Sequence, residues 1–236
     1  MRCCLIFLLF AACSGTQPPG PSDGGSHASA ELKACAAIQE PARVTTIAAA
    51  VSRLNALPRP VSVACFVAGL PRPLELVAST SMFSAQPAEG SQNPRIFLML
   101  PGLVISVAPT GDGARLLEFS QWITPTRTLK GELKLPLEAE VSGDAPYTQT
   151  HSNFGVTTCG LCHRREEAHP TIDGGFVSDA YRPEVYSLVP LSELSALHAA
   201  CTEDDLSERC TLFHALFDFG VVRQGAFSSA VELFIQ

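Results

Sequence analysis

The chain has 236 residues, a formal net charge of −7, and 46% hydrophobic against 17% charged residues. This length allows one or two domains, and this composition supports a buried core rather than a disordered chain. The sequence has no basic cluster larger than Arg164-Arg165, which argues against a nucleic-acid-binding surface. Its nine cysteines exceed what a reducing cytosol usually retains without a metal or redox purpose.

The N-terminus has the pattern of an export signal. A short positively charged start precedes an apolar run over residues 3–12, which is too short to span a bilayer. The tetrapeptide Phe10-Ala11-Ala12-Cys13 resembles the lipobox of bacterial lipoproteins. The resemblance implies that residues 1–12 are a lipoprotein signal peptide and that a lipid on Cys13 anchors the exported chain to the cell envelope, with Ser14 favouring the outer membrane. The alternative is an ordinary signal peptide with a chance cysteine.

Beyond the signal we expect three parts. Residues 13–30 are rich in Gly, Pro and Ser and predict a flexible tether. Residues 31–150 contain most of the strand patterns and predict a β-rich scaffold domain. Residues 151–236 contain the motif described below and two helical patterns, and predict a helical module.

The elements of the scaffold follow from periodicity. Apolar residues recur at helical spacing within residues 44–57, and Pro58 ends this helix. The last strand pattern alternates apolar residues with charged ones such as Lys130, which should put the charged face in water, while Pro136 restricts it to a sheet edge or a bulge. The strands are expected at residues 61–67, 74–78, 95–100, 103–108, 114–123 and 129–141, with a hairpin connection at 109–113.

Six cysteines remain for the folded part once Cys3 and Cys4 leave with the signal and Cys13 takes the lipid. They are Cys35, Cys65, Cys159, Cys162, Cys201 and Cys210. An even number in an oxidising compartment favours disulfides. A bond between Cys35 and Cys65 would fasten the predicted helix to the sheet.

The motif that carries chemistry is Cys159-Gly160-Leu161-Cys162-His163. C-x-x-C-H is the attachment signature of c-type haem, since two thiols three residues apart reach the two vinyl groups of one porphyrin and the adjacent histidine points at the iron. The motif resembles that of single-haem bacterial cytochromes c, in the C-terminal part of the chain only. The resemblance implies a covalent haem c held by Cys159 and Cys162, with His163 as the proximal iron ligand. A helix is expected from Thr157 or Thr158 through the motif to Pro170.

The sequence does not identify the sixth iron ligand. The methionines are Met1, Met82 and Met99, so none follows the motif as in the usual soluble carriers. The iron would then have two histidine ligands or stay five-coordinate, or Met82 or Met99 would reach it from the sheet; histidine ligation would lower the potential. Among the histidines, His214 and His198 are far enough along the chain to reach the other side of the porphyrin. His214 is placed first because phenylalanines flank it on its helix.

Two further helices are predicted at residues 191–201 and about 205–219. They place His198 beside Cys201 and Cys210 beside His214 on shared helix faces. These four residues allow either a Cys201–Cys210 disulfide or a tetrahedral zinc site. The oxidising compartment favours the disulfide.

These patterns together predict an α+β fold, with an antiparallel β-rich N-terminal scaffold followed by a mainly α-helical C-terminal module that resembles a haem c domain. The leading hypothesis is a membrane-anchored lipoprotein with one covalent haem c that exchanges electrons with a redox protein partner, as a carrier or accessory subunit rather than an enzyme.

Two other classes of function compete with this hypothesis. One is a thiol oxidoreductase, because Cys-x-x-Cys also resembles thioredoxin-like sites, although no buried strand pattern precedes the motif here. The other is a non-catalytic, disulfide-stapled surface lipoprotein or binding module in which Cys159 and Cys162 form a structural bond.

Overall fold

The computed structural model describes residues 29–81, 86–151, 157–202 and 204–234. Three expected features lie outside these ranges: the signal peptide at residues 1–12, the lipidation site Cys13 and nearly all of the tether. Within them, no helix combines the length and the apolar character that crossing a membrane requires.

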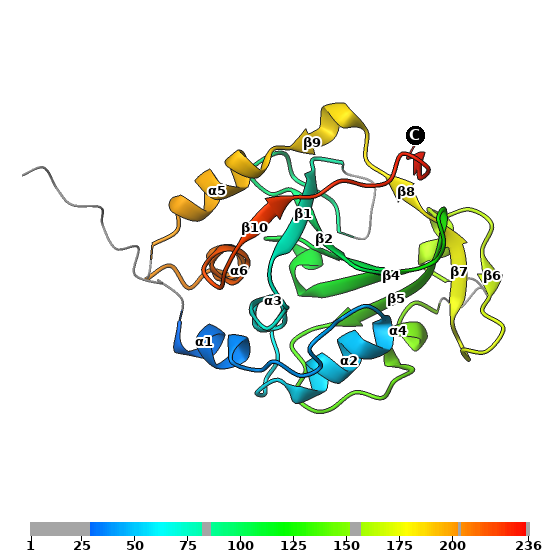
Figure 1. Ribbon diagram of the computed structural model, residues 1–236, viewed down its shortest axis with the longest axis horizontal. Coiled ribbons are helices and arrows are strands. Elements are labelled where there is room, and N and C mark those ends of the chain that lie inside the picture. Colours follow the sequence, from blue (N-terminus) through cyan, green and yellow to red (C-terminus); the bar gives the residue numbers. More distant parts are fainter. Residues whose placement is uncertain (1–28, 82–85, 152–156, 203, 235–236) are drawn as a thin grey trace, which may run out of the picture.

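One mixed sheet of nine strands organises the structure (Figure 1). The strands follow the order β10-β1-β2-β3-β4-β5-β7-β6, and β9 pairs with β1 outside this path. Strands β1 and β10 run parallel, whereas the other neighbours in this sheet are antiparallel. The strands are β1 (Leu74–Ser79), β2 (Arg95–Leu100), β3 (Leu103–Val107), β4 (Leu116–Thr124), β5 (Arg127–Lys134), β6 (Glu167–Ala168), β7 (Phe176–Asp179), β9 (Leu188–Val189) and β10 (Val222–Gln224).

Short helices pack against one face of this sheet, and two further strands form a separate pair. Strands β8 (Tyr181–Arg182) and β11 (Glu232–Leu233) pair in parallel with each other. The α-helices are α1 (Ala30–Ala36), α2 (Ile47–Ala56), α3 (Val63–Ala68), α4 (Ala145–Thr148), α5 (Leu191–Ala199) and α6 (Glu208–Phe217). Three 3-10 turns complete the described elements: η1 (Asp112–Arg115), η2 (Cys159–Leu161) and η3 (Val185–Ser187).

The helices and one face of the sheet form a single hydrophobic core. Successive strands send alternate side chains into it, among them Leu76, Leu98, Ile105, Leu117 and Leu129. Helix α6 packs against α3 and α5, and α3 packs against α1. The remaining strand residues of β2–β5 face the other side of the sheet, where polar and aromatic side chains gather.

Most of the expected scaffold elements occur close to their expected bounds. The helix expected at residues 44–57 is α2, and the strands expected between residues 74 and 123 are β1 to β4. The strand expected at residues 61–67 is wrong: the segment forms α3, where the Ser62 hydroxyl accepts a hydrogen bond from the Cys65 N–H at 3.0 Å. In a short run of almost entirely apolar residues, the sequence pattern does not distinguish a buried helix from a buried strand.

The expected strand at residues 129–141 is shorter in the structure, because β5 ends at Lys134. Pro136 lacks an N–H group and cannot continue the ladder of hydrogen bonds. Beyond it, Leu137 forms only an isolated bridge with Val61.

The expectation that the C-terminal part is mainly α-helical is wrong. Strands β6, β7, β9 and β10 come from the C-terminal part of the chain and belong to the same sheet as β1–β5. The helix expected to run through the motif to Pro170 is also wrong, because only the turn η2 forms there and the chain then enters β6. Arg165 has a φ of 52°, which breaks helical continuation, and β6 gains backbone pairing with β7.

Candidate functional site

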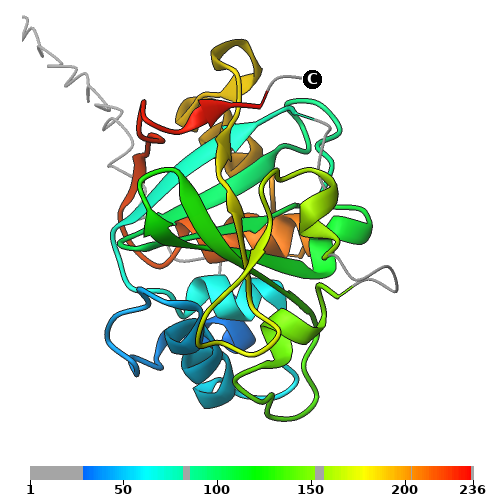
Figure 2. The same cartoon turned by 90° about the vertical axis from the view of Figure 1, so that its right-hand side faces the viewer.

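A pocket lies on the face of the sheet that does not contact the core helices. Its floor comes from strands β2–β5, including Arg95, Phe97, Glu118, Trp122 and Lys130. Its other walls come from the motif and from two later segments, including Cys159, Cys162, His163, Tyr181, Phe227 and Phe234. Figure 2 looks onto this side, where the yellow segment passes in front of the green strands. The fold thus brings all three expected haem-binding residues to one pocket.

The turn that carries the motif is held in place by Glu166. Its carboxylate accepts hydrogen bonds from the backbone N–H of Thr157 at 3.0 Å and from the Thr157 hydroxyl. A Cβ atom at Gly160 would come within 2.7 Å of this carboxylate, so the motif's middle glycine makes the close approach possible. After the turn, the His163 N–H donates to the carbonyl oxygen of Cys159 at 2.8 Å.

His163 is fixed in one tautomer. Its Nδ1 lies 2.7 Å from the backbone carbonyl oxygen of Asp179, and a carbonyl only accepts hydrogen bonds, so Nδ1 carries the proton. Burial, and then the charge of Lys130, lowers the pKa of His163 well below its usual range. The imidazole is therefore neutral at pH 7, with the lone pair on Nε2. Its ring stacks on Tyr181 with 5.6 Å between centroids.

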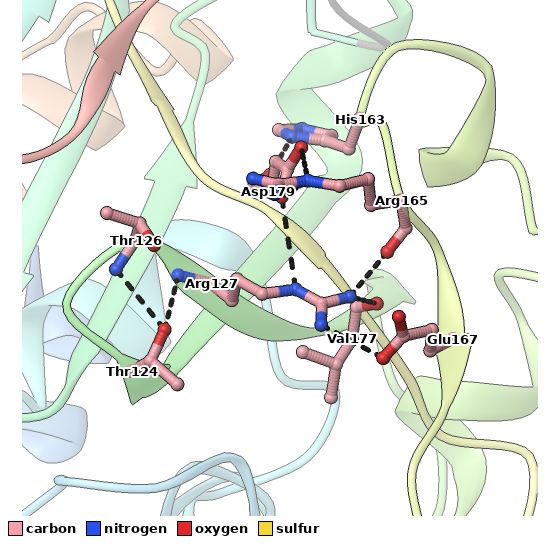
Figure 3. A network of polar contacts seen from close by, with 8 residues as sticks. All are labelled: Thr124, Thr126, Arg127, His163, Arg165, Glu167, Val177 and Asp179. Atoms are coloured by element: carbon pink, nitrogen blue, oxygen red, sulfur yellow. Dashed lines mark hydrogen bonds and ion pairs between the residues drawn. The ribbon is translucent and has the colours of Figure 1, made fainter.

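Asp179 also anchors the motif segment through its side chain (Figure 3). Its carboxylate accepts from the guanidinium of Arg165 at 2.9 Å, and Arg127 lies within 3.9 Å. Arg127 in turn pairs with Glu167 at 2.9 Å and donates to the carbonyl oxygen of Val177 at 3.1 Å. This network joins β5, β7 and the loop after the motif.

The two cysteines of the motif are free thiols, whereas the other four described cysteines are paired. Burial raises the pKa of Cys159 to about 11, although the nearby Lys130 opposes the shift. Cys159 is therefore a protonated thiol at neutral pH. A raised pKa is the reverse of what activates the nucleophilic cysteine of a thiol oxidoreductase.

The pocket floor contains a buried charged side chain, Lys130, which the strand pattern predicted to lie in water. Lys130 is only 4% exposed, and its ammonium donates to the Ser120 hydroxyl at 3.3 Å. Burial lowers its pKa to about 8. The alternation along β5 is present, but at Lys130 its polar face lies under the motif segment and is not solvated.

Other polar groups of the floor are paired or lack a partner. Arg95 forms an ion pair with Glu118 and donates to Ser106 at 2.9 Å. Burial, with the charge of Glu118 second, raises the pKa of Glu132 to about 6. Among the described residues, the hydroxyls of Tyr181 and Thr128 line the pocket and have no hydrogen-bond partner. A ligand with polar edges would satisfy them.

The expected sixth ligands do not join this site. His198 and His214 lie on α5 and α6, both are hydrogen-bonded to Asp218, and neither lines the pocket. Figure 1 shows these helices at the end of the sheet near β10 and β1. Met99 packs beside Gly225 and does not line the pocket either, and Met82 lies outside the described residues. The structure thus offers no support for His214 or His198 as a ligand to the same iron as His163.

Both disulfides expected from the sequence are present. Cys35 bonds Cys65, but the bond joins α1 to α3 and does not fasten a helix to the sheet, because Cys65 lies in a helix and not in the expected strand. Cys201 bonds Cys210 and joins the chain after α5 to the first turn of α6. The zinc alternative that used both thiolates of Cys201 and Cys210 is therefore not what the structure contains.

Comparisons with protein-family models, with curated proteins and with solved structures find no match to this chain. The chemistry of the pocket is therefore the evidence for a function.

Sequence reasoning missed three residues of this site. Lys130 appeared only as part of a solvated strand face, and Asp179 and Tyr181 appeared in no motif. A charge on one face of a strand has the same pattern whether water or another segment covers that face. No local signal distinguishes the two cases.

Proposed function

We propose that this protein is a lipoprotein of the cell envelope, anchored through Cys13, that binds one covalent haem c through Cys159, Cys162 and His163 and exchanges electrons with a redox protein partner. The observation that carries the proposal is that two free thiols and one neutral imidazole line the same pocket. Such a haem would cycle between ferric and ferrous iron, and the potential would be set by its ligand and surroundings.

The residues of the pocket are compatible with this group in three respects. A proton held on Nδ1 by the Asp179 carbonyl leaves Nε2 of His163 as a ligand, which is the usual arrangement of a metal-binding histidine. Aromatic side chains of Phe97, Trp122 and Phe227 give the walls an apolar character. Lys130 and Arg95 supply positive charge for the propionate carboxylates.

The enclosed volume limits how such a group would be held. The pocket measures about 130 Å³, which is below the ~300 Å³ at which pockets for drug-sized ligands usually begin. A porphyrin would therefore be only partly enclosed, with an edge left exposed. An exposed edge suits electron transfer to a protein partner.

In this proposal each part of the site has a defined task. Cys159 and Cys162 attach the group, and His163 binds the iron. Asp179 positions His163 through its carbonyl and the motif segment through its carboxylate. The buried floor beneath them excludes water.

The test is covalent haem in the full chain, expressed together with the haem attachment machinery. We expect the purified protein to stain for haem after denaturation and to show a Soret band. A Cys159→Ser, Cys162→Ser double variant should lose the stain, while His169→Ala, which replaces a nearby histidine outside the pocket, should keep it. A colourless wild-type protein whose mass shows unmodified Cys159 and Cys162 contradicts the proposal.

That negative result would favour the non-catalytic binding module. The binding-module hypothesis also predicts a disulfide between Cys159 and Cys162, whereas both are free thiols in the structure. Peptide mapping without reduction separates free thiols, a disulfide and thioether-linked haem in one measurement.

A further inference from the structure

A second cluster of potential metal ligands lies where α5 meets α6, apart from the pocket. One nitrogen from each of His198 and His214 and one carboxylate oxygen of Asp218 lie within 4.8 Å of one another. The Asp218 carboxylate contacts Nε2 of His198 at 2.8 Å and Nδ1 of His214 at 2.9 Å. This cluster is not used by the proposed haem site.

The local fold explains why these three residues meet. The Cys201–Cys210 disulfide clamps the end of α5 to the start of α6. His198 lies one turn before the first cysteine, and His214 lies one turn after the second. Asp218 follows four residues after His214, at the cap of α6, and so returns to the same face.

The surroundings favour a bound cation. Both histidines are in the last turn of their helices, where the helix dipole stabilises positive charge. The side chain of His214 is only 7% exposed, and its Nε2 is buried with no hydrogen-bond partner among the described residues. An unpartnered buried nitrogen is costly, so the contacts with Asp218 do not satisfy every polar atom gathered here.

We propose that His198, His214 and Asp218 bind one divalent transition-metal ion of the Zn²⁺ class. Two imidazoles and one carboxylate are a ligand set typical of zinc, with metal–ligand distances of about 2.0–2.2 Å. Side-chain rotations that move these atoms by roughly 1 Å or less would reach those distances. His198 is 24% exposed, so water can occupy the fourth position from its side. The ion would join α5 to α6 beside the disulfide.

Zinc titration of the full chain in detergent tests this site. The Cys159→Ser, Cys162→Ser variant serves as the background, because free thiols in the motif would bind zinc themselves. After dialysis against EDTA, we expect this background to take up one zinc per chain and to unfold at a higher temperature as zinc is added.

Variants in the same background locate the ion. His198→Asn removes a half-buried ligand, and Asp218→Asn keeps the shape of the side chain; each should weaken zinc binding at least tenfold. His169→Asn is the matched control, because Nδ1 of that imidazole accepts the backbone N–H groups of Thr171 and Ile172, and His169 belongs to no ligand cluster among the described residues. It should leave the affinity unchanged.

Two results would overturn the proposal. One is a background protein that binds no zinc, and the other is a His198→Asn variant that binds zinc as tightly as His169→Asn. Circular dichroism in EDTA checks that each variant folds, and if Asp218→Asn does not, His198→Asn alone decides. Neither result bears on covalent haem, so the two proposals fail separately.

Discussion

Nδ1 of His163 and the backbone carbonyl oxygen of Asp179 lie 2.7 Å apart, so strand β7 orients the histidine of the motif. Because the acceptor belongs to the backbone, no side-chain substitution at position 179 removes it directly. The carboxylate of the same residue holds Arg165, which lies two residues beyond His163. Residue 179 therefore positions the motif through two separate groups.

We predict that Asp179→Asn destabilises the protein by about 1–3 kcal/mol, because Arg165 and Arg127 lose a charged acceptor whose side chain is almost fully buried. Urea unfolding measures the change. Glu208→Gln is the control, since its partner Arg115 is exposed and such pairs contribute about 0–1 kcal/mol. Equal losses in the two variants would show that the Asp179 network does not stabilise the fold.

Lys130 and Cys159 should produce opposite pH dependences of stability in the haem-free chain. Burial lowers the pKa of Lys130 from 10.5 to about 8, so the unfolded state binds more protons between these values and stability rises with pH there. The rise amounts to about 3 kcal/mol. Burial raises the pKa of Cys159 from 9.0 to about 11, so its contribution is complete below pH 9 and is lost as pH increases towards 11.

Single variants separate these two contributions. In Cys159→Ser, unfolding free energy should rise from pH 8 to 10.5. In Lys130→Met, it should fall from pH 9 to 11, and the wild type should show the two effects partly offset. Lys134→Met, an exposed lysine on the same strand, should behave like the wild type. A Cys159→Ser profile that stays flat above pH 8 would show that Lys130 keeps an ordinary pKa.

The two disulfides should differ in their contribution to stability. They close loops with sequence separations of 30 and 9 residues. Loop-closure entropy then predicts about 3.6 kcal/mol for Cys35–Cys65 and about 2.6 kcal/mol for Cys201–Cys210. Urea unfolding of the two double Cys→Ser variants measures which disulfide contributes more to the free energy of unfolding. A larger loss from the shorter loop would indicate that zinc or native-state contacts at α5–α6 outweigh chain entropy.

We predict that His198→Asn leaves the haem absorption spectrum unchanged, because this side chain lies with Asp218 and outside the pocket. His163→Ala should change the spectrum or prevent haem attachment. Absorption and magnetic circular dichroism spectra of the purified proteins decide both points. A ligand change in His198→Asn would mean that α5 approaches the pocket in the haem-bound state.

We predict that Cys13→Ala abolishes lipid labelling and releases the protein from the membrane fraction. Stable anchoring of a lipoprotein requires more than one acyl chain, and Cys13 is the residue expected to carry them. Metabolic labelling with a radioactive fatty acid, followed by fractionation, measures both effects. A labelled, membrane-associated Cys13→Ala protein would contradict the lipobox interpretation, and Ser14→Ala serves as the control.

Local patterns predicted many elements and, apart from the disulfide pairs, none of the long-range arrangement. Strands β1 to β4 were found because their apolar residues alternate or run continuously between turns. The segment around Cys65 was misassigned because a fully buried run has no polar face to reveal its period. The C-terminal part was misjudged because β6, β7 and β10 are two to four residues long, which is too short for a periodic signal. They form by pairing with β7, β5 and β1, respectively.

The sequence by itself determined the motif at Cys159–His163, the pairing candidates among the other cysteines and the resemblance of residues 10–13 to a lipobox, because each depends on residue type and close spacing. Only the tertiary structure decided that the motif lies over the polar face of β2–β5, and that Lys130 is buried there. It also decided that Asp179 holds His163 and that Asp218 joins His198 and His214. These contacts, most of them between residues distant along the chain, depend on how strands and helices pack rather than on local sequence.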